Sequence, residues 1–451
     1  MGTLGLLAIF LICILIHLPM AFSILLSNLV LSVDGGYSIM SNVSGIFTGC
    51  DSFTLLAIPF FMLAGNIMCE GGIADRIINF CESLVGHHTG GFGLITIVAC
   101  FFFAAIAGSA VATIAAIGAL MIPMMVNRGY SREYASALAA CASTMGPIVP
   151  PSVLFIPFCV MAGKSVSTLF AGGLVPGALM GICMGVMNYL ICKKEGYVGT
   201  GTRKSAKEIL HSLKDGWLSL LMPVIILVCI YGGICTPTEV AVIACLYSLF
   251  LGLVIYKEIT FKDVVKIFVD TASSAASVLI IVGPALVFGR LLAMERVPQA
   301  LTAWTNSVIS SRVVFLIFIN LVLLVVGMFM ETTSAILILT PLFVPLAASY
   351  NVNTYHFGMI MIINLAIGLC TPPMGLCAFT GAKIGNTSFA SIFKYLLPLI
   401  LSLLVALLLV TFVPQLTYFL PHLLGMNMGA CPSAAYSLFR SYADHDRVVG
   451  Q

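Results

Sequence analysis

The sequence predicts an all-α polytopic membrane protein built from two inverted repeats, each with a re-entrant helical hairpin and a broken helix. Three observations carry this prediction: the composition, a duplicated Pro-Pro motif and the placement of basic residues. Hydrophobic residues make up 60% of the 451 residues and charged residues only 8%, with a mean hydropathy of +1.13. Most of such a chain must lie in lipid or in protein interior, which excludes an ordinary soluble domain.

A motif that ends in two prolines occurs twice, as GPIVPPS from Gly146 and as GLCTPPM from Gly368, inside long apolar stretches. A Pro-Pro pair breaks a helix because it removes N–H donors and clashes with the preceding turn. The same offset of 222 residues relates several other pairs without a gap: Pro123 and Pro345, Pro150 and Pro372, Gly163 and Gly385, Pro176 and Pro398, and Gly108-Ser109 and Met330-Glu331. Duplicated broken helices are typical of secondary transporters, whose site lies at the repeat interface.

Basic residues set the predicted orientation, because short loops rich in Lys and Arg stay in the cytoplasm. One such loop spans 193–214 and another spans 257–266, so the helices predicted at 217–233 and 240–256 form an out-and-back pair. Arg128 and Arg132 mark a third cytoplasmic loop, whose repeat partner at 350–355 has no basic residue. We therefore expect inverted copies. Basic loops can also bind nucleic acid or lipid headgroups, but topology is their commoner role, and we expect no nucleic-acid partner.

The first half, residues 1–192, begins with an apolar run at 4–31 that we expect to remain as a helix, since no basic residue precedes it and it outlasts a signal-peptide core. Glycines at 90–93 open the first hairpin, which turns at Ala107-Gly108-Ser109 and ends near Asn127. The broken helix at Pro150 follows. Small residues at the tip permit close approach of the backbone.

Residues 193–265 are predicted to be a basic linker and a scaffold helix pair without broken helices. The second half, residues 266–424, repeats the hairpin, which enters at Val313, turns near Glu331 and leaves near Tyr350, and then the broken helix at Pro372. Residues 425–451 lose hydrophobicity, and we expect them to form a disordered polar tail.

Broken helices supply chemistry that suits ion-coupled transport: free carbonyls coordinate a cation, and half-helix N-termini attract a carboxylate. Hydroxyl side chains add oxygens at the same places, at Ser109, Ser152, Thr332, Thr333 and Thr371. A single Ser, Thr or Gly in a membrane helix more often serves close packing. The matched placement in both copies favours a binding role.

Glu331 stands out because a carboxylate near mid-bilayer costs about 2.5–3.5 kcal/mol. Two interpretations remain open: a cation, proton-coupling or substrate-hydroxyl ligand, or an N-cap of the following helix. Asn66 and Asn364 are interpreted as interhelical contacts, and Glu239 as a helix cap. The sequence contains no H-E-x-x-H motif, no paired membrane aspartates and no G-x-S-x-G elbow, so an intramembrane enzyme is not expected.

Several segments together resemble the large membrane (permease) subunit of tripartite ATP-independent periplasmic (TRAP) transporters. The resemblance covers the chain up to about Pro421 and rests on LLAIPFFMLAGNIM at 55–68, AGSAVATIAAIGALMIPMM at 107–125, GPIVPPS, LFAGGLVPG at 169–177, TPTE at 236–239, LILTPLFVPL at 337–346 and NLAIGLCTPPMG at 364–375. The family more often has Ser where this chain has Ala107, and Asp where it has Glu331.

The resemblance implies an elevator-type transporter in the bacterial inner membrane, in which a domain of hairpins and broken helices slides against a scaffold. It implies sodium symport of an organic acid, such as a C4-dicarboxylate, a sialic acid or another sugar acid, without a further cofactor. The implied partners are a small membrane subunit and a periplasmic substrate-binding protein. A stand-alone sodium- or proton-coupled carboxylate transporter of related fold is the alternative.

The resemblance also implies ligand residues by position. One cation site would use Ser109, Gly146, Val149 and Ser152. The second would use Gly327, Gly368, Thr371 and Met374. The substrate would lie between the hairpin tips, near Ser109, Ala110, Glu331 and Thr332. No catalytic residue is implied, and sodium is the only metal expected.

Overall fold

The computed structural model describes residues 9–428 except 11, 14, 15, 17, 200, 202 and 203. Every regular element in this part of the chain is helical, and nine of its helices are long and apolar enough to cross a membrane. This confirms the predicted all-α membrane class. Most of the predicted polar tail and part of the predicted first helix lie outside the described residues.

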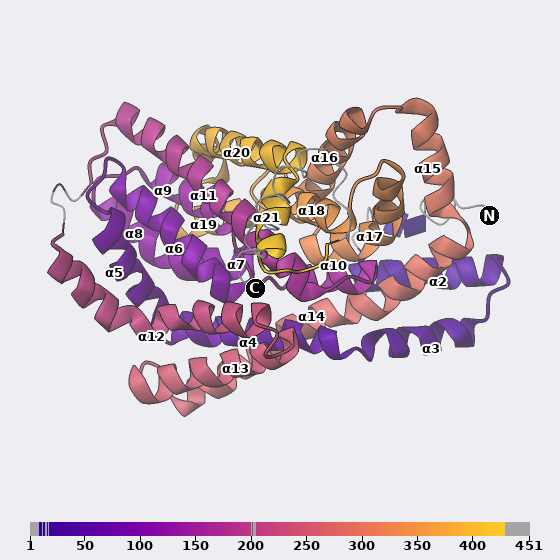
Figure 1. The fold of residues 1–451 in the computed structure, drawn as a ribbon, viewed down its shortest axis with the longest axis horizontal. Coiled ribbons are helices and arrows are strands. Elements are labelled where there is room, and N and C mark those ends of the chain that lie inside the picture. Colours follow the sequence, from indigo (N-terminus) through magenta and orange to yellow (C-terminus); the bar gives the residue numbers. More distant parts are fainter. Residues whose placement is uncertain are drawn as a thin grey trace, which may run out of the picture.

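The two copies have matching elements at the predicted offset of 222 residues (Figure 1). The first copy runs through α4 (Ala57–Glu70), α5 (Ile73–Val85), α6 (Gly91–Ala107), α7 (Ala110–Thr113), α8 (Ala119–Asn127), α9 (Arg132–Ser143), α10 (Phe155–Ala162) and α11 (Val166–Glu195). The second runs through α14 (Phe261–Met294), α15 (Val297–Val308), α16 (Arg312–Phe329), α17 (Thr332–Ser349), α18 (Thr354–Gly368), α19 (Leu376–Ile384) and α20 (Phe389–Phe412). Helix α21 (Gln415–Leu423) follows without a counterpart helix at this offset.

Each copy contains the predicted hairpin. In the first, Gly108 ends α6 with a positive φ of 60°, Ser109 is extended, and the return arm passes through α7, a π-helical segment (Ile114–Gly118) and α8. A positive φ is accessible to glycine at little cost, which is why the chain turns there. In the second, α16 ends at Phe329, and Glu331 is the N-cap of α17.

Each copy also contains the predicted broken helix. Helix α9 ends at Ser143 and α10 begins at Phe155, whereas α18 ends at Gly368 and α19 begins at Leu376. The peptide bonds Pro150–Pro151 and Pro372–Pro373 are both cis. The same backbone feature therefore occurs at equivalent positions of both copies.

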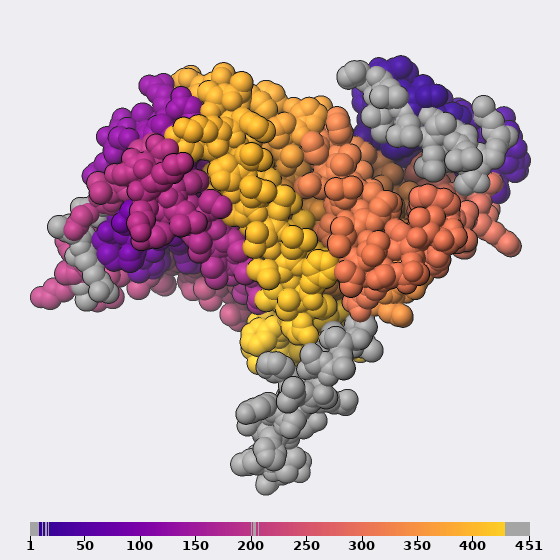
Figure 2. Space-filling view, turned by 90° about the horizontal axis from the view of Figure 1, so that it is seen from above, coloured from indigo at the N-terminus to yellow at the C-terminus, as the bar shows by residue number. Residues whose placement is uncertain are grey.

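The copies pack reciprocally. Helix α9 of the first copy contacts α19 of the second, where a Cβ on Gly381 would lie 2.8 Å from the Ser136 carbonyl oxygen. Conversely, α18 of the second copy contacts α10 of the first, where Gly358 meets the Phe158 ring. In a two-fold relation, each contact from the first copy to the second is matched by an equivalent contact from the second copy to the first. The two copies have this kind of relation. Figure 2 shows α20 and α21 (yellow) lying between the magenta helices of the first copy and the orange helices of the second.

The scaffold comprises α4, α5, α14 and α15 together with four further helices: α2 (Met20–Asp34), α3 (Ile39–Cys50), α12 (Ala206–Tyr231) and α13 (Pro237–Phe250). Helix α13 packs on α4, and α2 packs on α14. Thr236 and Glu239 form a capping box at the start of α13, which confirms the predicted cap. Helix α14 begins at Phe261, so the predicted boundary at 265/266 falls inside it.

The basic linker differs from the sequence prediction. Lys193 and Lys194 lie in the last turn of α11, and α12 already begins at Ala206 behind a capping box formed by Ser205 and Glu208. Only residues 196–205 connect the two helices. Charged residues can continue a helix beyond the apolar span, so a change in polarity does not mark the end of the helix.

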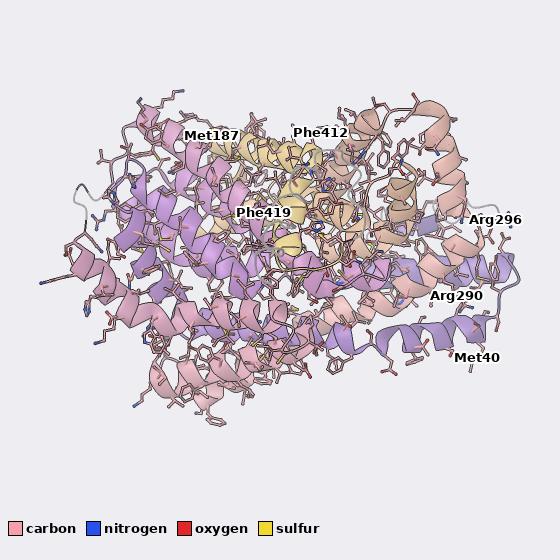
Figure 3. The ribbon with its side chains drawn as sticks, in the orientation of Figure 1. Met40, Met187, Arg290, Arg296, Phe412 and Phe419 are labelled. Carbon is pink, nitrogen blue, oxygen red and sulfur yellow. The ribbon has the colours of Figure 1, made fainter. Side chains whose placement is uncertain are left out.

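Polar contacts hold both ends of the scaffold. At one end, Arg76 on α5 donates to Glu258 at 2.9 Å and stacks on Tyr256. At the other end, the Tyr37 hydroxyl donates to the Glu295 carboxylate at 2.7 Å, and this hydrogen bond raises the pKa of Tyr37. Arg290 and Arg296 lie near that end, where α14 passes into α15 (Figure 3).

Candidate functional site

The first hairpin tip lies directly against the first broken helix. The Val153 amide donates to the Gly108 carbonyl at 3.3 Å, and a Cβ on Gly108 would lie 2.8 Å from the Pro151 carbonyl oxygen. A Cβ on Gly146 would lie 2.6 Å from the Ser109 carbonyl oxygen. Backbones meet here at a distance that only glycine permits. The structure thus brings together Ser109 and Gly146, which the resemblance assigned to one cation site.

Oxygen atoms line this first contact. The Ser152 hydroxyl donates to the Pro147 carbonyl at 2.6 Å and accepts from the Leu154 amide at 3.2 Å. Val149 and Ser152 are both fully buried. Buried carbonyl and hydroxyl oxygens on a broken helix are the ligands that a coupling cation uses in this class of site.

The second predicted cation site also rests on a close backbone contact. Gly327 on α16 and Gly368 at the end of α18 approach so closely that a Cβ on Gly368 would meet the Gly327 backbone. The Thr371 hydroxyl donates to the Ile367 carbonyl at 2.9 Å. Met374 is 61% exposed, in contrast to the fully buried Val149 and Ser152 of the first site. The first predicted cation site is therefore largely buried, whereas the second is partly exposed.

Glu331 acts as a helix cap. One carboxylate oxygen accepts hydrogen bonds from the amide and hydroxyl of Thr333, and the other accepts them from the amide and hydroxyl of Ser334. All four distances lie between 2.8 and 3.1 Å. These bonds confirm the capping interpretation. A role in coupling or substrate binding stays a prediction.

Thr332 differs from its neighbours at this tip. Its side chain is only 3% exposed, and its Oγ1 has no hydrogen-bond partner. Buried polar atoms are normally paired, so this hydroxyl is an exception at the tip. Among the described residues, no hydrogen bond joins Ser109 or Ala110 to Glu331 or Thr332, and the predicted substrate residues of the two copies are not brought into direct polar contact.

The sequence analysis missed a cleft of about 460 Å³ between the first hairpin and the scaffold. Hairpin alanines such as Ala112 and Ala116 line one side, and Glu70, Asp75 and Asp270 line the other. Helix α5, which carries Asp75, is tied to the basic turns through Arg76–Glu258 and Glu82–Lys204. Because the positive-inside rule predicts that these basic turns lie in the cytoplasm, it also predicts that the cleft lies on the cytoplasmic side. The available signal was the series of alanines at helical spacing in residues 110–119.

The two asparagines predicted as interhelical contacts have that role. The Asn364 side chain on α18 donates to Asn320 on α16 at 2.7 Å, and Asn66 on α4 donates to Thr271 on α14 at 2.8 Å. Asn320 was not predicted, although it stands alone in an apolar run.

A protein-family model described as "Tripartite ATP-independent periplasmic transporter, DctM component" matches residues 7–416. The sialic acid TRAP transporter large permease protein SiaM of Vibrio cholerae is 39% identical over 90% of this chain and 95% of its own length. The C4-dicarboxylate TRAP transporter large permease protein DctM of Pseudomonas aeruginosa is 36% identical over 86% of this chain and 91% of its own length.

Some relatives are longer. The isethionate TRAP transporter permease protein DctMQ of Oleidesulfovibrio alaskensis is 38% identical over 92% of this chain, which spans only 65% of that relative. Among solved structures, the YdaH transporter of Alcanivorax borkumensis superposes with a TM-score of 0.60 over 84% of this chain and 88% of the other, at 16% identity. That likeness concerns the fold alone.

Proposed function

We infer, because the chain belongs to the tripartite ATP-independent periplasmic (TRAP) transporter family as a DctM component, that it imports an organic acid by sodium symport. It is a large permease subunit of the bacterial inner membrane, and its relatives are transport permeases, not enzymes. The relatives' names mention sialic acid, C4-dicarboxylate and isethionate. All three are organic anions, which supports an organic acid as the substrate class.

One observation carries the coupling proposal: in both copies, a glycine of the broken helix meets the backbone of the hairpin. In our proposal, Ser109, Gly146, Val149 and Ser152 hold one sodium ion, and Gly327, Gly368, Thr371 and Met374 hold the other. The close Gly146–Ser109 and Gly327–Gly368 contacts support this assignment. Met374 would contribute its carbonyl oxygen.

The substrate is proposed to lie between the two tips, near Ser109, Ala110, Glu331 and Thr332. The unpaired Thr332 hydroxyl supports this position, since a substrate oxygen would satisfy it. Glu331 orders the tip through its four hydrogen bonds. The cleft lined by Glu70, Asp75 and Asp270 is not proposed as the path of the acid, because its negative charge would repel an organic anion.

Transport is proposed to follow an elevator mechanism, in which hairpins and broken helices slide against the scaffold. The alanine-lined face of the first hairpin supports this, because small side chains offer little resistance to sliding. A small membrane subunit braces the scaffold, and a periplasmic substrate-binding protein delivers the acid. The greater length of the DctMQ relative supports an additional membrane subunit.

Uptake in reconstituted vesicles tests this proposal. Vesicles with this chain and its small subunit should accumulate the acid only with an inward sodium gradient and with the binding protein outside. Replacing sodium by potassium should abolish accumulation, because potassium is larger than sodium and does not fit a compact site of oxygen ligands. Uptake that follows a proton gradient instead, or that is robust without the binding protein, would favour the stand-alone alternative.

A further inference from the structure

Two cysteines meet at the turn that joins α12 to α13. Cys229 lies in the last turn of α12, and Cys235 directly precedes Thr236, the N-cap of α13. The two helices pack side by side (Figure 1). The Cys235 thiol has the Cys229 thiol as a hydrogen-bond partner, and both thiols are free in this structure. The turn therefore holds a reduced pair of neighbouring thiols.

Backbone hydrogen bonds fix the two cysteines in this arrangement. The amides of Ile234 and Cys235 both donate to the Cys229 carbonyl, at 3.0 and 3.3 Å. Gly233, with a φ of 65°, lets the chain reverse between them. A disulfide requires Cα atoms about 4.4–6.8 Å apart, and residues joined by a backbone hydrogen bond meet this condition. A bond between the two sulfur atoms is therefore compatible with the backbone as it stands.

The turn lies on the periplasmic side of the membrane. The apolar spans Lys207–Tyr231 and Pro237–Ile255 are each long enough to cross the bilayer once. The basic residues at 193–214 and 257–266 place the opposite ends of both spans in the cytoplasm. In the turn itself, Ile234 is 68% exposed and Cys235 is partly exposed. The thiol pair is thus accessible from an oxidising compartment.

A second group of neighbouring thiols lacks this access. Cys370 has Cys141 on α9 and Cys377 on α19 as hydrogen-bond partners. All three side chains are fully buried where these helices of the two copies meet. A periplasmic oxidant does not reach them there, because no sulfur atom is exposed. They supply an internal control in which thiols are in contact but shielded.

We propose that Cys229 and Cys235 form a disulfide bond on the periplasmic side of the protein. The oxidant is a protein disulfide of the periplasm. One cysteine thiolate attacks it to give a mixed disulfide and one released thiol, and the second thiolate then displaces the other oxidant sulfur. The oxidant leaves as a dithiol, which carries the two electrons and the two protons that the cysteines lose.

The bond would stabilise the scaffold. It closes a short ring that includes the chain reversal, which restricts the unfolded chain. It also fixes the position of Thr236, which forms the capping box with Glu239 at the start of α13. Because α13 packs on α4, this staple holds one part of the scaffold to another and takes no part in substrate binding.

Mass spectrometry of the full chain tests the proposal. The protein is purified from its bacterial membrane without reductant, its free thiols are alkylated after denaturation, and it is then digested. Cys229 and Cys235 should be found linked, unalkylated and lighter by two hydrogen atoms, whereas Cys141, Cys370 and Cys377 should be fully alkylated. Complete alkylation of Cys229 and Cys235 without prior reduction would overturn the proposal.

Labelling of intact cells with an impermeant thiol reagent gives a second readout. In the wild-type chain, label at Cys229 and Cys235 should be absent before treatment with an impermeant reductant and present after it. Cys235→Ser should expose Cys229 to the reagent without reductant. The control Cys377→Ser should leave the turn unlabelled, as in the wild type. Label at the turn of the wild-type chain before reduction would show that the pair stays reduced. Failure of Cys229 to label in the Cys235→Ser chain would contradict the periplasmic placement on which the proposal depends.

Discussion

At the scale of single residues, glycines decide how close the hairpin and the broken helix can come. Gly146 faces the Ser109 carbonyl with no room for a methyl group, and Gly368 faces the Gly327 backbone in the same way. Each is the first residue of its seven-residue Pro-Pro motif, GPIVPPS or GLCTPPM. The motif therefore combines a break in the helix with the space that the tip needs.

Substituting Gly146→Ala should reduce sodium-dependent uptake about tenfold or more at equal protein levels. The added Cβ would lie 2.6 Å from the Ser109 carbonyl oxygen, and relieving that clash must shift the tip or the broken helix. The measurement is initial uptake as a function of sodium concentration in vesicles.

Gly185→Ala in α11 is the matched control, because its Cβ would make an ordinary contact of 3.6 Å with Leu94. Unchanged uptake in both variants would show that the Gly146 contact does not serve transport.

At the scale of secondary-structure elements, buried amides hold helices together within each domain. Asn364 on α18 donates to Asn320 on α16, and Thr411 on α20 also donates to Asn320, at 3.4 Å. Three helices of the second copy thus share one polar contact. Pairs of this kind contribute on the order of 0.6 kcal/mol on average in membrane proteins.

Asn364→Leu should lower the thermal stability of the detergent-solubilised protein by about 1 kcal/mol, because it removes one donor and leaves Asn320 short of a partner. Thermal unfolding of the single variants and of the double variant with Asn320→Leu measures the coupling between the two side chains. Strictly additive effects in this cycle would contradict the contact.

At the scale of the whole molecule, reciprocal packing relates the two copies. Helix α9 meets α19, and α18 meets α10, as a two-fold relation requires. Equivalent polar clamps, Arg76–Glu258 and Tyr37–Glu295, lie at opposite ends of the scaffold. Inverted copies can exchange conformations, which is the structural basis of alternating access.

Inversion predicts opposite sidedness for equivalent loops. In a background without native cysteines, Asn127→Cys should resist an impermeant thiol reagent added outside intact cells, because Arg128 and Arg132 place it in the cytoplasm. Ser349→Cys, the partner at the same offset, should react. Both positions are exposed, so burial does not prevent labelling. Equal labelling of both from one side would make the copies parallel.

The sequence by itself determined the membrane class, the duplication and the positions of the hairpins and breaks. These features depend on local chemistry, since apolar length, a Pro-Pro pair or a tip glycine acts on its own segment. The helix caps at Glu239 and Glu331 could also be predicted from the sequence, because a cap involves residues only two or three positions away.

Only the tertiary structure decided which residues meet. The Asn320 contact, the cleft with Glu70 and Asp270 and the unequal burial of the two breaks all join segments far apart in the chain. The packing angle and separation of helices set such contacts, and neither is encoded in local spacing. For the same reason, the sequence could identify Ser109, Thr332 and their neighbours as candidate ligands. Only the fold showed that the hairpin and broken-helix backbones touch and that the Thr332 hydroxyl has no hydrogen-bond partner.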